Sequence, residues 1–168
     1  LDEAGQLEIQ GLARLGDRAL VLDAGGAIWS SDGTEAGTEC VTRIQPQTGG
    51  WLNWGSNPVF SPTAAGDGLF VAFTVGSACG GESTAEIWQT DATAAGTWFV
   101  AGVAKDWNFA PNPILASAGG LSYFIGAGRI AWTDGSPGNA QPLLGGPSDV
   151  PVTLRAAGGR LFAQFASS

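Results

Sequence analysis

A motif that occurs three times constrains the fold of this 168-residue chain more than any other feature. In each copy, a short apolar run ends near a tryptophan and is followed by a turn that resembles Asp-Gly-Thr. The three copies are Ile28–Thr38, Ile87–Thr97 and Ile130–Gly138. A glycine turn followed by an apolar run precedes each copy and occurs once more at the end, beginning at Gly16, Gly66, Gly119 and Gly158. Repeats of about 40 to 50 residues with several short strands are typical of β-propellers.

Each full repeat predicts four short strands, because apolar runs alternate with glycine-containing turns. The first repeat predicts strands at about Leu7–Leu15, Arg18–Asp23, Ala27–Ser31 and Thr38–Ile44. The second predicts strands at about Val59–Ala65, Leu69–Val75, Glu86–Thr90 and Thr97–Val103. The third predicts strands at about Ile114–Ala118, Leu121–Gly126, Arg129–Thr133 and Ala140–Leu144. The fourth predicts two, at about Val152–Ala156 and Arg160–Phe165.

These strands predict an all-β fold, because no window has helical periodicity that escapes a Gly or Pro. We expect one repeat domain of β-propeller-type blades, each made of four antiparallel strands. About three and a half repeats leave the ring incomplete in this chain. The expected blades are residues 7–44, 57–104 and 112–145, with a half blade at 150–168.

The repeated turn has a structural interpretation. An Asp side chain accepts hydrogen bonds from the backbone two or three residues on, a Gly supplies positive φ, and a Trp packs between neighbouring sheets. The residues given these roles are Trp29, Asp32, Gly33, Trp88, Asp91, Trp132, Asp134 and Gly135. The pair Asp91-Ala92 departs from the pattern, so this turn is expected to be strained or of another type. One carboxylate in each turn forms neither a calcium cage nor a catalytic acid pair.

This motif resembles that of the ELWxxDGT repeat family. Ile28–Thr38 is a close match that lacks only the first Glu and the Leu, which are Ala27 and Ile28 here. Glu86–Thr93 keeps the glutamate but has Ala for Gly. Arg129–Ser136 is the most degenerate copy, and the resemblance covers nearly the whole chain. It implies a tandem β-propeller-like repeat from large secreted or surface proteins, mostly bacterial, with no established activity and therefore no catalytic residues. Either the rest of the ring lies outside this chain, or several chains close it together.

Composition excludes several classes of function. The chain has no His, which excludes a Ser-His-Asp triad and any His-ligated zinc within it. A formal net charge of −8 lacks the basic surface that nucleic acid or an anionic membrane requires. No apolar run reaches the roughly 18–20 residues of a membrane helix. We expect no catalytic residue, metal or cofactor. Because the chain starts at Leu1, we also expect a piece of a longer exported protein whose signal lies upstream.

The long connections between blades are the expected ligand site, because they should lie on the same side as the insertion Gly76–Thr84. These connections are Gln45–Pro58 and Ala104–Pro113. Tryptophans beside Asn and Asp suit stacking on sugar rings or a protein contact. The candidate ligand-binding residues are Trp51, Asn53, Trp54, Asp106, Trp107, Asn108 and Phe109. The alternative is that these aromatic residues fill gaps between blades.

The two cysteines, Cys40 and Cys79, allow two interpretations. In an exported protein they could form one disulfide, which would staple a Gly- and Ser-rich loop. Alternatively they are two buried thiols, because Cys40 aligns with Phe99 near the face opposite Cys79.

Three functions compete. The first is a non-catalytic binding or adhesion scaffold on the cell surface, whose partner is a glycan or a protein. The second is a structural subunit of a surface layer or filament that assembles by pairing of edge strands. The third is a carbohydrate-active enzyme using carboxylates, for which the only candidates on the proposed face are Glu82, Asp106 and Asp149.

Overall fold

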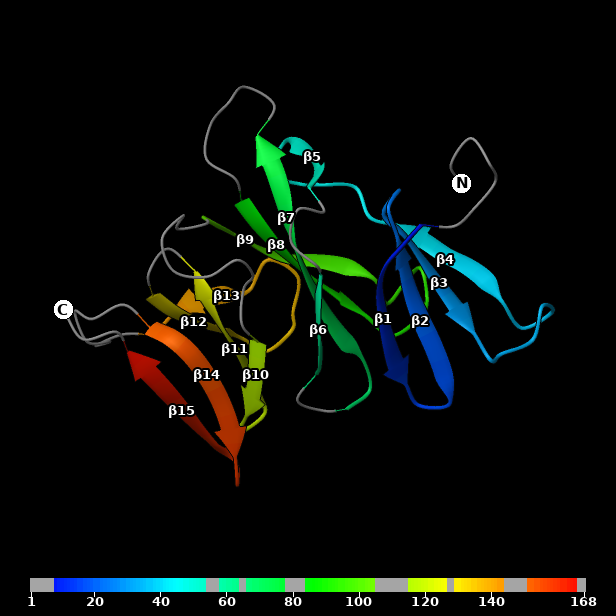
Figure 1. Ribbon diagram of the computed structural model, residues 1–168. Helices are drawn as coiled ribbons and strands as arrows, with labels where there is room; N and C mark the ends of the chain where they lie inside the picture. The colour runs from blue at the N-terminus through cyan, green and yellow to red at the C-terminus, as the bar shows by residue number, and fades with distance from the viewer. Residues whose placement is uncertain are drawn as a thin grey trace.

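The computed structural model describes residues 8–53, 58–63, 66–77, 84–104, 115–126, 129–143 and 151–165. This part of the chain is all-β and contains no helix (Figure 1). Its strands form four antiparallel sheets, which follow one another in chain order.

The sheets are built mainly from strands that are neighbours in sequence. The first contains β1 (Ile9–Leu15), β2 (Arg18–Asp23), β3 (Ala27–Ser31) and β4 (Glu39–Arg43). The second contains β5 (Gly50–Asn53), β6 (Val59–Pro62), β7 (Leu69–Ser77), β8 (Thr84–Thr90) and β9 (Trp98–Ala104). The third contains β10 (Leu115–Ala118), β11 (Leu121–Gly126), β12 (Arg129–Thr133) and β13 (Ala140–Pro142). The fourth contains β14 (Pro151–Ala157) and β15 (Arg160–Phe165).

The glycine turns place the hairpins, which is why the predicted strands largely agree with the observed ones. Five strands, β2, β3, β11, β12 and β15, have the predicted bounds. The hairpins β1–β2, β6–β7, β10–β11 and β14–β15 each have a glycine with positive φ in their turn, namely Gly16 (61°), Gly66 (77°), Gly119 (61°) and Gly158 (56°). In the second sheet, β6 to β9 correspond to the first to fourth strands of the other sheets, and β5 is additional. An L residue with a side chain rarely adopts this conformation, so glycine fixes where each strand ends.

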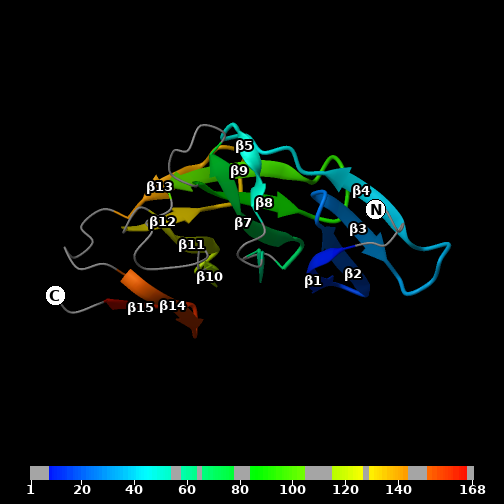
Figure 2. The ribbon, with the colours of Figure 1, turned by 45° about the horizontal axis from the view of Figure 1, so that its top comes forward.

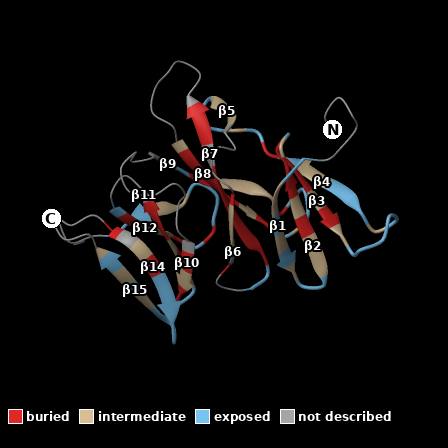
Figure 3. Ribbon diagram, viewed as in Figure 1, coloured by how far each residue is buried: buried red, intermediate tan, exposed pale blue. Residues whose placement is uncertain are grey.

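The core lies between successive sheets. Leu20, Leu22 and Ile28 of the first sheet pack against Val71 and Trp88 of the second. The opposite face of the second sheet and the facing side of the third form another cluster, centred on Phe70, Ile87 and Phe124. A last cluster joins the third and fourth sheets through Ile125, Ile130 and Leu154. Each inner sheet therefore buries both faces (Figure 3).

The stack of sheets is curved. The first strands of successive sheets, β1, β6, β10 and β14, contact one another along one side. The last strands, β4, β9 and β13, lie along the other side, where the sheets spread apart (Figure 2). The four sheets thus form a fan with their first strands on the inside.

Side-chain alternation decides which neighbouring sheet each residue contacts, because successive residues of a strand point to opposite faces. The residue four before the turn Asp faces the next sheet, as Ile28 and Ile87 do. The residue three before it faces the preceding sheet, as Trp88 does.

The expectation that three tryptophans share one packing role is wrong for Trp132. Trp132 lies two residues before Asp134, whereas Trp29 and Trp88 lie three residues before their Asp. This one-residue shift places Trp132 on the opposite face, and Ala131 packs against the second sheet in its place.

The turns after the third strands are equivalent in all three repeats. Asp32, Asp91 and Asp134 each accept a hydrogen bond through Oδ1 from the amide two residues on, at 2.8–2.9 Å. The residue after each Asp has positive φ: 93° at Gly33, 69° at Ala92 and 92° at Gly135. The turn at Asp91 is therefore of the same type as the others, with an alanine in a left-handed conformation.

Replacing glycine in these turns should destabilise the fold by different amounts. We expect Gly33→Ala to lower the free energy of unfolding by about 1–2 kcal/mol, because φ is positive and the added Cβ would meet open space. Gly135→Ala should cost more, since its Cβ would also approach Gln89 Oε1 and Phe70. Urea denaturation of both variants measures the difference, and equal losses would contradict this account.

Candidate functional site

The ligand site is expected on the side of the molecule where the connections between successive sheets begin. In the first sheet, Ile44 donates its amide hydrogen to Gly26 O at 2.8 Å, beside the β2–β3 turn. The third sheet repeats this arrangement, since the Leu143 amide donates to Ile130 O at 2.9 Å. The described starts of these connections therefore lie beside the second-to-third-strand end of their sheets.

The structure places part of the first connection in a strand. Trp51 and Asn53 lie in β5, whose backbone pairs with the end of β7 at Gly76 and Thr74. β6 pairs with the beginning of the same strand, so β5 extends the edge that β6 begins. The sequence did not predict β5. The other candidate residues, Trp54, Asp106, Trp107, Asn108 and Phe109, lie outside the described residues, as do Glu82, Asp149 and Cys79.

Leu52 attaches β5 to the core. It packs against the cluster between the first two sheets, and its side chain lies next to Gly26 in the β2–β3 turn. Gly26 has a positive φ of 80°, which favours glycine, and a Cβ there would also displace Leu52 Cδ1. The strand that contains Trp51 is therefore supported by both sheets.

Glu86 holds the beginning of the same connection. Its side chain is fully buried, and its Oε1 accepts hydrogen bonds from the amides of Gln47 and Thr48, both at 2.7 Å. The Thr48 hydroxyl donates to the same oxygen at 2.8 Å, and Trp88 Nε1 donates to Oε2 at 2.9 Å. Four donors satisfy one buried carboxylate, which is what makes its burial tolerable. The connection is thereby fixed to the third strand of its sheet.

Asp23 has the corresponding role in the first sheet. It is 5% exposed, and it accepts hydrogen bonds from the Ala27 amide at 2.8 Å and from Trp29 Nε1 at 3.0 Å. The acceptor for the tryptophan thus comes from β2 in one sheet and from β8 in the next. Both buried acids are used as hydrogen-bond acceptors. The sequence contained this signal, since Glu86 precedes Trp88 by two residues and so shares its face.

The turn carboxylates at the opposite ends of the third strands are electrostatically stabilised. Hydrogen bonds from the hydroxyl and the amide of Thr34 lower the pKa of Asp32 below its ordinary value of 3.8. The Ser136 amide is the main cause of a lowered pKa at Asp134, assisted by the Ser136 and Asn139 side chains. These interactions favour the charged form. They support the structural role that the sequence predicted.

A polar groove of about 380 Å³ lies at the ends of β6 and β10, beside the β14–β15 turn. It was not predicted from the sequence. It is lined by Ser61, Pro62, Thr63, Ser117, Ala118, Gly119, Gly120 and Gly159. Ser117 Oγ donates to Pro62 O at 3.0 Å and so connects the second and third sheets across it. No charged side chain lines this groove. The recurring glycine turns were visible in the sequence, but only the stacking of the sheets brings them together.

The described residues also bear on the expectations about cysteines, metal sites and membrane spans. Cys40 is exposed in β4 with a free thiol, so the expectation of a buried thiol is wrong for it. Within the described ranges, no three His, Cys, Asp or Glu side chains are grouped so that they could hold a metal ion. The described residues also contain no helix with the length and hydrophobicity needed to span a membrane.

No protein-family model, no curated protein and no solved structure matches the chain. Its function must therefore be argued from its own residues.

Removing the Glu86 carboxylate should strongly destabilise the protein. Glu86→Ala would leave four donors without their acceptor, so we expect a loss of about 3 kcal/mol or more in the free energy of unfolding. Asp23→Ala should cost about 1–2 kcal/mol, because only two donors lose their partner. Denaturant titration followed by tryptophan fluorescence provides the measurement. Exposed Glu35→Ala is the control, and a similar loss in all three variants would refute the anchoring role.

Stability should fall with acidification through the turn aspartates. Because the pKa values of Asp32 and Asp134 are lower in the folded state, the unfolded chain binds more protons. Their contribution to the free energy of unfolding is complete above the unfolded-state pKa of 3.8. It is lost as the pH falls through their lower folded-state pKa values. Asp32→Asn should therefore flatten the dependence of stability on pH between about 5 and 2. An unchanged slope in that variant would show that the turn carboxylate does not contribute.

Proposed function

We propose that the chain is a non-catalytic β-propeller-type module of an exported or cell-surface protein, and that it binds a glycan or a protein. The ligand would bind on the side where the connections leave the sheets. The observation that carries this proposal is the way in which the first connection, Gln45–Pro58, is attached to the sheets. Its aromatic segment forms β5, and Glu86 fixes the residues before it. Binding residues held by a rigid scaffold lose little entropy when a ligand arrives.

Three features support a propeller-type arrangement. The sheets are antiparallel, follow each other in chain order and stack face to face around a common inner side. The equivalent turns at Asp32, Asp91 and Asp134 favour true repeats, as the resemblance to the ELWxxDGT family implies. In this proposal each of the first three sheets is one blade, and β5 adds a fifth strand to the second.

The chemistry of the candidate residues favours a glycan or a protein as ligand. Trp51, Trp54 and Trp107 offer apolar ring faces, and Asn53 and Asn108 offer hydrogen bonds. The net charge of −8 disfavours nucleic acid. The non-catalytic part of the proposal is supported by the use of Asp23 and Glu86 as acceptors within the fold.

Substitution of the connection tryptophans should weaken ligand binding without unfolding the protein. A ligand would first be identified by glycan-array screening and by pull-down with cell-surface proteins. Trp51→Ala and Trp107→Ala should each raise its Kd by about tenfold or more, as expected for aromatic hot spots. Trp132→Ala is the matched control, because Trp132 lies in the third sheet and is only half-buried.

Two results would overturn the proposal. One is the absence of any retained ligand in both screens. The other is a ligand whose Kd is unchanged in Trp51→Ala and Trp107→Ala.

A further inference from the structure

The outer face of the first sheet has the same arrangement of residues as the face of the second sheet that packs against its neighbour. Leu12, Val21 and Trp29 are cross-strand neighbours on the face turned away from the second sheet. Their equivalents in the second sheet, Phe60, Val71 and Trp88, have the same pairing. There, Val71 and Trp88 are buried against the preceding sheet, and the half-buried Phe60 packs beside them.

The exposed fractions of equivalent residues show that this outer face is uncovered. Leu12 is 66% exposed, whereas the equivalent Leu154 of the fourth sheet is 3% exposed because the third sheet covers it. Cys40 is also exposed, while Phe99 at the same register position packs edge-to-face on Trp88. Among the described strands, therefore, no sheet covers these residues on the outer face of the first sheet.

The fourth sheet presents the complementary surface. Phe162 is the fourth residue after a turn glycine, as are Leu20 and Phe70. Those two residues are 0% and 1% exposed because the next sheet covers them, whereas Phe162 is 55% exposed. Arg155 pairs with Phe162 across the hairpin and is also exposed.

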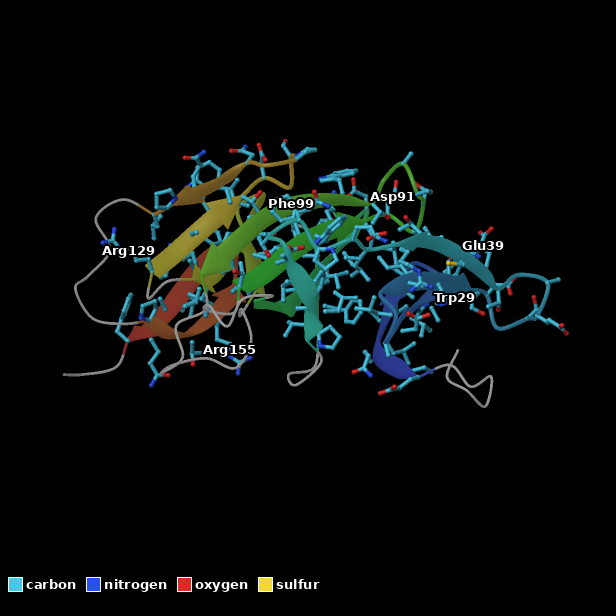
Figure 4. All side chains as sticks on the ribbon, turned by 90° about the horizontal axis from the view of Figure 1, so that it is seen from above. Trp29, Glu39, Asp91, Phe99, Arg129 and Arg155 are labelled. Carbon is cyan, nitrogen blue, oxygen red and sulfur yellow. The ribbon has the colours of Figure 1, made fainter. Side chains whose placement is uncertain are left out.

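The register also shows which charged residues lie on the two outer faces. Arg14 lies two residues after Leu12 in β1 and so shares its face, whereas Glu39 pairs with Ser30 and faces the second sheet. Arg155 lies on the outer face of the fourth sheet with Phe162. Glu39 and Arg155 lie on opposite sides of the molecule (Figure 4). The match between the two outer faces is therefore one of apolar residues at equivalent register positions.

We propose that the outer face of β14–β15 stacks on the outer face of β1–β4 of a second copy of this chain, head to tail. The contact continues the sheet-to-sheet interface that the chain forms three times within itself. Apolar surface is matched at Leu12 and Phe162, which are 66% and 55% exposed in the single chain. Such a contact is heterologous, so two copies would place eight sheets in one ring if the rotation closes. Eight is within the range of β-propellers.

This association differs from pairing between edge strands. Edge pairing would use backbone groups of strands such as β4 and β13, and it would depend little on Leu12 or Phe162. Face-to-face stacking depends on these two side chains directly.

The oligomeric state of the 168-residue chain tests the proposal. Analytical ultracentrifugation should show concentration-dependent association. Leu12→Arg and Phe162→Asp would each place a charge inside the apolar contact, and each should raise the dissociation constant by about 30-fold or more. Leu143→Asp is the matched control, because Leu143 is an exposed leucine on neither outer face, and it should associate like the wild type.

A mixing experiment distinguishes head-to-tail stacking from symmetric contacts. Leu12→Arg keeps its fourth-sheet face and Phe162→Asp keeps its first-sheet face, so an equimolar mixture should form a 1:1 complex through one intact contact. A wild-type chain that stays monomeric at all accessible concentrations would overturn the proposal. So would loss of association in only one of the two variants, because that indicates a symmetric contact. If a charged variant shifts the denaturation midpoint, Leu12→Ser and Phe162→Ser replace it.

Discussion

Burial of apolar faces between successive sheets holds this protein together. A two-stranded hairpin such as β14–β15 is marginally stable in water by itself, yet Leu154 is 3% exposed because the third sheet covers it. The second sheet depends on both neighbours, with Trp88 on one face and Ile87 on the other. Where a neighbour is missing, at Leu12 and Phe162, apolar side chains remain in solvent. The fold is therefore cooperative along the stack, with each sheet stabilising the next.

Polar groups fix the geometry that this packing leaves undetermined. The buried carboxylates of Asp23 and Glu86 orient tryptophans and connections, and the exposed carboxylates of Asp32 and Asp134 close turns. These aspartates and this glutamate would otherwise be considered as catalytic or metal-binding groups. Their donors account for them structurally, which is why the proposed ligand site relies on aromatic residues of the connections instead.

Sequence reasoning succeeded where one residue type controls local geometry, and it failed where the partner is distant. The hairpin turns at Gly16 and Gly119 were predictable because only glycine adopts positive φ without cost. β5 was missed because its four residues become a strand only by pairing with the end of β7, more than twenty residues away. The role of Trp132 was wrong because matching residue types hid a shift of one position, and in a strand that shift reverses the face.

The sequence by itself determined the all-β class, the three recurring Asp turns and most strand positions, because these depend on contacts within a few residues. Only the tertiary structure decided which face of each sheet is covered, how Glu86 fixes the first connection, and where the groove beside Ser117 lies. These features join residues far apart in the chain. Their formation depends on the order and curvature of the stacked sheets, which local patterns do not encode.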